Sequence, residues 1–164
     1  MSQSRLRLLQ DMPIFGGISE PTLQFLLGLA PIVSIPKGEY FFREGDEAAS
    51  MFVLETGKVV VLKDWQGHDY LLRFLNKGDC FGEMALMDLF PRSASVLALE
   101  DCSAIEISFT TLYQLYQQDL EQYTLIQMNM GREVSRRLRE AAKQLFQAKM
   151  EAKVSDNTIT FYST

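Results

Sequence analysis

The first thirty residues carry apolar side chains at the spacing of amphipathic helices. Apolar residues recur over positions 6–11 with a helical period, and Pro13 ends that segment. Ser19 can cap a second helix, because Glu20 and Pro21 follow it as favourable first-turn residues. We expect this second helix to end at about residue 29, and we expect both helices to pack against the rest of the chain.

From residue 32 to residue 108 the pattern changes to short apolar runs separated by turns. Glycine marks many of these turns, at positions 38, 45, 57, 67 and 78. Short, evenly spaced runs favour an antiparallel barrel or jelly roll over alternating β–α–β units. We predict a mainly β fold, a jelly-roll barrel with N-terminal helices and a long C-terminal helix. Its strands are expected at 32–35, 40–43, 51–54, 58–62, 70–75, 95–99 and 103–108.

The C-terminal part of the chain returns to a helical period. Residues 109–111 cap a helix that we expect to reach residue 118, and Asp119 begins a longer helix to about residue 150. Its second half has a two-heptad seam with alternating steps of four and three, formed by Val134, Leu138, Ala141, Leu145 and Ala148. The seam fits a dimer helix or a helix packed on its own barrel, and we favour the dimer. The nearby arginines indicate a solvated face, since no aromatic residues interleave with them.

Composition narrows the possible functions. The 164 residues suit one domain, and the formal charge of −5 opposes non-specific binding to nucleic acid. Cys80, Cys102 and the lone His68 show no metal-ligand spacing, and no nucleophilic triad can be assembled around that histidine. A metal-dependent enzyme of cupin type is therefore disfavoured. No apolar run approaches the roughly 20 residues of a membrane span, so we expect a cytoplasmic, non-enzymatic protein.

The segment 81–95 has neither a strand pattern nor that of a long helix. Gly82 allows a tight turn and the close approach of a ligand, and residues 83–86 favour a short helix. A helix N-terminus suits an anion, so the carboxylate of Glu83 fits a neutral hydroxyl beside that anion. Arg92 can bind the anion with its planar set of donors. The alternative is an ordinary surface ion pair between Glu83 and Arg92.

This segment resembles the phosphate-binding cassette of cyclic nucleotide-binding domains, of the catabolite-activator and FNR type. It reads Phe-Gly-Glu-Met-Ala-Leu at 81–86 and Pro-Arg-Ser-Ala-Ser at 91–95, and the wider resemblance covers about residues 10–145. The resemblance implies that Glu83 binds the ribose 2′-hydroxyl and that Arg92 binds the cyclic phosphate. It also implies that the remaining contacts come from Gly82, Met84, Ala85, Ser93 and Ala94.

The resemblance gives domain boundaries as well. We predict a cyclic nucleotide-binding domain over residues 1–153, with its β-roll at about 30–108 and its C-terminal helix at about 119–150. Residues 154–164 would form a tail that either adds a strand or stays disordered. Relatives that regulate transcription continue into a helix-turn-helix domain. The sequence ends before such a domain, so we expect no direct binding to DNA.

The sequence defines the contacts to the base less well than those to the phosphate and ribose. In the catabolite-activator branch, hydroxylated residues of the dimer helix contact adenine, and alignment on residues 136–138 places Ala141 and Ala142 there. Alanine offers no hydrogen bond, and a hydroxyl at Ser93 could serve either the guanine amino group or the phosphate. We assign Arg139 and Ala142 to a lid over the base, and we favour cAMP over cGMP.

The leading hypothesis is a cyclic-nucleotide sensor that relays ligand binding through its C-terminal helix to an unknown downstream protein. We expect a homodimer formed through Val134, Leu138, Ala141 and Leu145. One alternative is a ligand-free dimeric scaffold with the same fold. Another is the effector domain of a truncated transcription regulator. The same fold serves all three, so the site must distinguish them.

Overall fold

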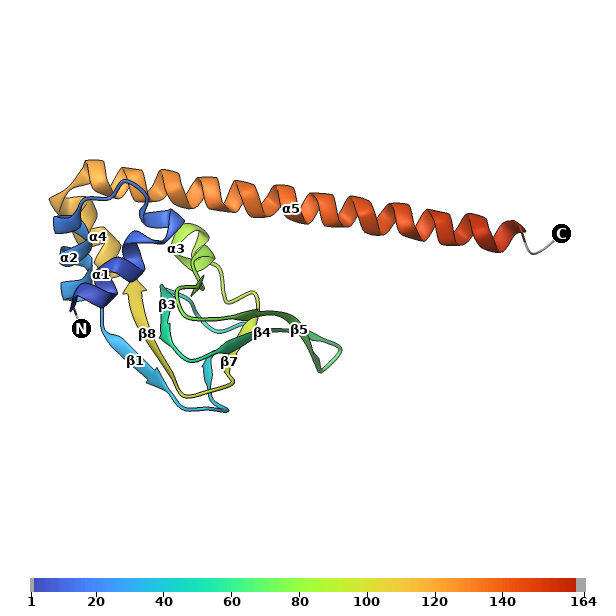
Figure 1. Cartoon of the computed structure of the whole chain (residues 1–164), viewed down its shortest axis with the longest axis horizontal. Coiled ribbons are helices and arrows are strands. Elements are labelled where there is room, and N and C mark those ends of the chain that lie inside the picture. Colours follow the sequence, from blue (N-terminus) through green and yellow to red (C-terminus); the bar gives the residue numbers. More distant parts are fainter. Residues whose placement is uncertain (1, 162–164) are drawn as a thin grey trace.

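Two four-stranded antiparallel sheets form a jelly roll, and helices gather at one side of it (Figure 1). The computed structural model describes the backbone of residues 2–161 and the side chains of residues 3–155. The sheets have the strand orders β1-β8-β3-β6 and β2-β7-β4-β5. The strands are β1 (Ile32–Ile35), β2 (Tyr40–Phe42), β3 (Ser50–Thr56), β4 (Val59–Trp65), β5 (His68–Leu75), β6 (Cys80–Phe81), β7 (Ser95–Ala98) and β8 (Cys102–Ser108). The helices are α1 (Ser2–Gln10), the 3-10 helix η1 (Pro13–Phe15), α2 (Glu20–Leu29), α3 (Met84–Asp88), α4 (Phe109–Gln118) and α5 (Leu120–Phe161).

Strand β3 takes part in two layers of hydrophobic core. Its first five residues are all buried, because both faces of the strand are covered. Met51 and Val53 pack in the cluster formed with the helices, whereas Phe52 and Leu54 pack between the two sheets. Successive side chains of a strand point to opposite faces, so one strand joins both clusters.

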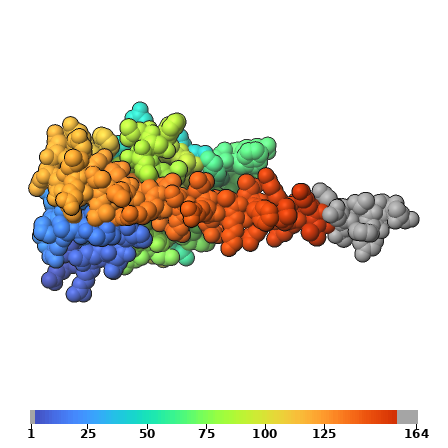
Figure 2. Space-filling model, turned by 90° about the horizontal axis from the view of Figure 1, so that it is seen from above, coloured from blue at the N-terminus to red at the C-terminus, as the bar shows by residue number. Residues whose placement is uncertain are grey.

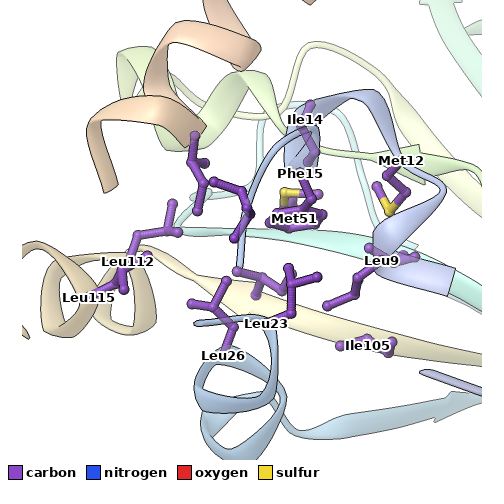
Figure 3. Packing of buried hydrophobic residues seen from close by; sticks show 14 of the residues in the cluster. Leu9, Met12, Ile14, Phe15, Leu23, Leu26, Met51, Ile105, Leu112 and Leu115 are labelled. Atoms are coloured by element: carbon purple, nitrogen blue, oxygen red, sulfur yellow. The ribbon is translucent and has the colours of Figure 1, made fainter. Parts of the chain in front are cut away.

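The cluster on the helical side joins segments that lie far apart in the sequence. Figure 3 shows leucines of α1, α2 and α4 around Met51 of β3 and Ile105 of β8. Ser19 caps α2 as predicted, because its Oγ accepts a hydrogen bond from the Thr22 backbone N–H. The helices therefore form a fixed layer against which the long C-terminal helix begins.

Helix α5 is anchored at its N-terminal end and projects beyond the sheets (Figure 1, Figure 2). Ile126 and Met130 are buried, and the buried Asn129 amide donates hydrogen bonds to the carbonyl oxygens of Ile14 (3.2 Å) and Gly16 (2.8 Å). From residue 138 to residue 155 every side chain is exposed. None of the helices in the described part of the chain is both long and apolar enough to cross a membrane.

The predicted fold class is confirmed, and three details of the prediction are wrong. Strand β6 was not predicted, because two residues show no periodicity. Helix α4 is capped by Ser108, whose Oγ accepts a hydrogen bond from the Thr111 N–H (3.1 Å). Helix α5 continues past residue 150 to Phe161, since no proline or glycine interrupts residues 151–161. The alternatives of a strand or a disordered tail therefore fail up to residue 161, and residues 162–164 lie outside the described part.

The turn at Gly57 generates a stability prediction. Gly57 has φ +90°, and a Cβ there would lie 2.7 Å from the Asp101 carbonyl oxygen. We expect Gly57→Ala to lower the free energy of unfolding by ~1–2 kcal/mol for the left-handed backbone and by ~1–3 kcal/mol more for the steric conflict. Gly38→Ala is the control, because Gly38 has φ +87° and open space around it. Urea unfolding of both variants measures the difference, and equal losses would contradict the steric argument.

Candidate functional site

The segment between β6 and β7 contains one short helix bounded by two unusual backbone conformations. Gly82 has φ +79° just before α3, and Leu89 ends α3 with φ +56°. Glycine adopts such a conformation without strain, whereas leucine rarely does. The chain thus turns sharply on both sides of α3 and returns Arg92 toward Gly82, whose carbonyl accepts a hydrogen bond from Arg92 Nη1 at 3.2 Å.

This segment surrounds a cavity of about 140 Å³. All seven residues that the sequence assigned to ligand binding line it: Gly82, Glu83, Met84, Ala85, Arg92, Ser93 and Ala94. Five residues of the sheets line it as well, namely Phe42 of β2, Val61 of β4, Arg73 of β5, Phe81 of β6 and Val96 of β7. The cavity is therefore built from the cassette and from the inner face of the jelly roll.

Arg92 is buried without a counterion. Its side chain is 7% exposed, and its guanidinium carbon lies 3.9 Å from the centre of the Phe42 ring. Among the described residues it forms no ion pair, and its buried Nε has no hydrogen-bond partner. Burial lowers the pKa of Arg92, while the negative charges of Glu106 and Asp46 oppose that shift. An anion in the cavity would supply the charge that this guanidinium lacks.

Backbone pairing holds the Arg92 segment against the turn after β2. The Gly45 N–H donates to the Arg92 carbonyl (2.8 Å), and the Arg92 N–H donates to the Asp46 carbonyl (2.9 Å). Ser95 supports the same turn, because its Oγ accepts a hydrogen bond from the Glu44 N–H at 2.8 Å. The last serine of the motif is therefore committed to structure.

Lys63 of β4 connects this turn to the next residue of the cassette. Its Nζ donates to the Ser93 carbonyl oxygen at 2.7 Å and forms an ion pair with Glu44. The Glu44 carboxylate also accepts a hydrogen bond from the Asp64 N–H at 3.0 Å. The hydrogen bond of Lys63 lowers the pKa of Glu44 first, and that of Asp64 lowers it further. Ser93 is thus held through its carbonyl group, and the residue lines the cavity.

Glu83 links the cassette to the C-terminal helix. Its carboxylate is 4% exposed and forms an ion pair with the Arg137 guanidinium of α5. Arg137 Nε also lies 3.2 Å from the Glu133 carboxylate one turn earlier. Arg137 is the last residue up to position 155 whose side chain is not exposed. The ion pair with Glu83 therefore uses the last partly buried side chain of α5 before its exposed part, residues 138–155.

The structure does not bring the predicted lid residues Arg139 and Ala142 to the cavity. Arg139 lies on another face of α5, beside Arg132 and Arg136, and Ala142 is exposed. Arg137 and Arg73 line the cavity in their place, and sequence reasoning missed both. Charged residues are frequent from 132 to 143, so no spacing distinguished Arg137 from its neighbours. The one signal for Arg73 was its position within the otherwise apolar run 70–75.

No group of acidic, histidine and cysteine side chains in the described part of the chain is arranged to hold a metal ion. The cavity instead combines a buried cation, a buried carboxylate and an apolar wall, which is suited to a small amphipathic anion. Residues 32–119 match the family model described as the cyclic nucleotide-binding domain. The chain belongs to this family.

Similar proteins include regulators and a kinase. The cyclic nucleotide-binding domain is 34% identical over 109 residues to human cGMP-dependent protein kinase 2, covering 65% of this chain and 14% of the kinase. It is 30% identical over 142 residues to the cyclic AMP receptor protein of Thermus thermophilus, covering 84% and 62% of the two chains. The crystal structure of the Thermus thermophilus catabolite activator protein superposes with a TM-score of 0.73 at 29% identity, covering 82% and 62%. The chain therefore spans about three fifths of its bacterial relative and a small part of the kinase.

The contact between Gly82 and Arg92 can be tested directly. A Cβ on Gly82 would lie 2.5 Å from Arg92 Nη1, so Gly82→Ala must displace the guanidinium. We expect a loss of cyclic-nucleotide affinity of about tenfold or more, the equivalent of 1.4 kcal/mol. Gly38→Ala has a similar φ but lies away from the cavity, so we expect it to keep its affinity. Isothermal titration with cAMP and cGMP measures both variants, and equal affinities would argue against the contact.

Proposed function

We propose that this domain is a non-enzymatic sensor that binds a cyclic mononucleotide and relays binding through α5. The observation that carries the proposal is the buried guanidinium of Arg92, which faces the cassette without a carboxylate partner. A singly charged cyclic phosphate would neutralise it and accept charge-assisted hydrogen bonds from it. The family match supports this class of ligand.

The positions of the two charged residues suggest how the nucleotide is oriented. The phosphate would lie at Arg92 with the backbone N–H groups of the cassette, close to Ser93. The ribose would extend toward Glu83, whose carboxylate can accept a hydrogen bond from the 2′-hydroxyl. This placement uses the chemistry of each group, because Arg92 supplies only donors and an ionised Glu83 supplies only acceptors.

The relay would act through the ion pair between Glu83 and Arg137. In the structure the Glu83 carboxylate is already occupied by Arg137. A ribose hydroxyl at Glu83 must therefore replace or share this contact. Because Arg137 belongs to α5, ligand binding would change how the helix is held against the cassette.

Homodimerisation is the proposed route to a downstream response. Leu138 and Leu145 of the predicted seam are 68% and 58% exposed, and Ala141 between them is exposed as well. Exposed leucines at coiled-coil spacing favour a partner helix, and the small alanine allows close approach. A second copy of α5 would cover Val134, Leu138, Ala141 and Leu145.

A ligand-free dimeric scaffold is the second candidate, and one observation favours it. The ion pair of Glu83 with Arg137 already satisfies the carboxylate that the ribose needs. A scaffold would keep that pair permanently and would use the α5 seam alone. The counterion missing at Arg92 favours the sensor, since a permanent scaffold has no use for a buried unpaired cation.

The role of Arg92 gives the test of the proposed function. We expect Arg92→Ala to weaken cyclic-nucleotide binding about 10- to 150-fold, because a hydrogen bond to a charged group contributes about 1.5–3 kcal/mol. Arg7→Ala is the matched control, since Arg7 is an exposed arginine of α1 and does not line the cavity. Calorimetry with cAMP and cGMP measures the affinities. An affinity within about threefold of wild type would remove the phosphate role of Arg92. No binding of either nucleotide by a stable wild-type dimer would support the scaffold.

The relay predicts a difference between two adjacent arginines. Arg137 pairs with Glu83, whereas the more exposed Arg136 pairs with Glu133 on its own helix (2.6 Å). We expect nucleotide binding to change amide hydrogen exchange along residues 134–145 in the wild type and in Arg136→Ala. In Arg137→Ala this change should be largely lost, while the nucleotide still binds. An unchanged exchange response in Arg137→Ala would show that the helix senses the ligand by another contact.

A further inference from the structure

Lys63 of β4 contacts the cassette from outside the cavity. Its Nζ donates a hydrogen bond to the Ser93 carbonyl oxygen at 2.7 Å and forms an ion pair with the Glu44 carboxylate. Lys63 does not line the cavity, whereas Ser93 and Ala94 do. The ammonium group therefore acts on the backbone of the cassette rather than on a ligand directly.

The stability of the fold gives little reason for this lysine. The side chains of Lys63 and Glu44 are 46% and 30% exposed, and an exposed ion pair adds little to stability because solvent screens it. Holding a long lysine side chain in one geometry also costs side-chain entropy. Glu44 has a second partner, since its carboxylate accepts a hydrogen bond from the Asp64 N–H at 3.0 Å. The contact specific to Lys63 is therefore the one to the Ser93 carbonyl.

The peptide bond between Ser93 and Ala94 transmits this contact. No peptide bond in the described part of the chain is cis, and in a planar trans peptide the carbonyl and the following N–H point in opposite directions. When Lys63 fixes the Ser93 carbonyl, it also fixes the direction of the Ala94 N–H. That N–H has no hydrogen-bond partner among the described residues. It is thus a free donor, directed away from Lys63, on a residue that lines the cavity.

A free backbone donor two residues after Arg92 suits a cyclic phosphate. Hydrogen bonds to an ionised acceptor are stronger than those between neutral groups. A donor contributes most when its direction is set before the ligand arrives, because less conformational freedom is then lost on binding. The hydrogen bond from Lys63 also polarises the Ser93–Ala94 peptide, which strengthens its N–H as a donor.

We propose that Lys63 is a positioning residue for the phosphate. It holds the Ser93 carbonyl so that the Ala94 N–H is presented to an exocyclic oxygen of the cyclic phosphate. The proposal rests on the proposed function of the same site. The resemblance named Ser93 and Ala94 as contacts, whereas Lys63 had no predicted role.

Calorimetry with cAMP and cGMP tests this role. We expect Lys63→Met to weaken binding of both nucleotides by about 3- to 10-fold, and by the same factor for each because they share the phosphate. Lys63→Arg should recover most of the loss, since a guanidinium can still donate to the Ser93 carbonyl. Lys37→Met is the matched control and should bind as wild type does, because Lys37 is an exposed lysine that does not line the cavity. The thermal midpoint of each variant, measured without ligand, verifies that it is folded.

Two sulfur-substituted nucleotides locate the effect at the phosphate. In the Rp and Sp phosphorothioates of cAMP, sulfur replaces one or the other exocyclic oxygen, and sulfur is a weak hydrogen-bond acceptor. The Ala94 N–H would serve only one of these two oxygens. We therefore expect the ratio of the two affinities to change by about threefold or more in Lys63→Met and to keep its wild-type value in Lys37→Met. A merely structural role of Lys63 would lower both affinities and leave their ratio unchanged.

Glu44→Gln separates the two contacts of Lys63. Glutamine can still accept the hydrogen bond from the Asp64 N–H, but it lacks the charge that pairs with Lys63. We expect its nucleotide affinity to stay within about twofold of wild type. A loss as large as that in Lys63→Met would show that Lys63 acts through Glu44, and it would overturn the inference.

The remaining outcomes separate this inference from the proposed function. Wild-type affinity in Lys63→Met, or an unchanged ratio of the two phosphorothioates, would overturn the inference while nucleotide binding itself would stand. If wild type binds neither cAMP nor cGMP, the proposed function fails and the inference fails with it.

Discussion

The unpaired guanidinium of Arg92 is the interaction on which the site depends. A buried cation without a counterion is unfavourable, so the surrounding structure must hold it in place. Here that is achieved by the backbone pairing of Arg92 with the turn after β2, and by stacking on Phe42. Lys63 and Ser95 secure the same turn, although neither lines the cavity. The cassette is therefore preorganised for an anion by residues outside its own binding groups.

The two buried charged residues of the cassette, Arg92 and Glu83, differ in whether they are paired, and this difference bears on which ligands can affect α5. Arg92 has no ion-pair partner among the described residues, whereas Glu83 is already paired with Arg137. A ligand with only an anionic group would fill the first position and leave the second pair intact. A ligand that also carries a neutral hydroxyl at the right distance would reach both. Under the proposed relay, the site would distinguish a cyclic nucleotide from inorganic phosphate by its effect on α5 as well as by affinity.

Local patterns in the sequence were sufficient for the fold and for the cassette, but they did not reveal the contacts between distant segments. Glycine turns and apolar runs predicted the strands, and the resemblance of residues 81–95 to a phosphate-binding cassette predicted residues that line one cavity. Strand β6 was too short to show a period. Arg137 lies 54 residues from Glu83, and its importance follows from where α5 crosses the cassette. Arg139, the predicted lid residue, does not line the cavity for a related reason. Residues two apart on a helix point to different faces, and here Arg137 rather than Arg139 lies at the cavity.

The geometry of α5 explains how a small change at one residue could affect a distant surface. Ile126, Asn129 and Met130 fix the start of the helix in the helical layer, and Arg137 makes its last partly buried contact. The helix has 42 residues, roughly 60 Å at 1.5 Å per residue, so a slight tilt about the anchored end becomes a large displacement at the other end. Leu138 follows Arg137 directly and Leu145 lies two helical turns further on, both on the exposed part. Exchange of the Glu83 contact between Arg137 and a ribose would thus act at the boundary between the domain and its proposed dimer seam. A sensor needs its ligand-dependent contact at such a boundary, because a contact deeper in the helical layer would be held by the core.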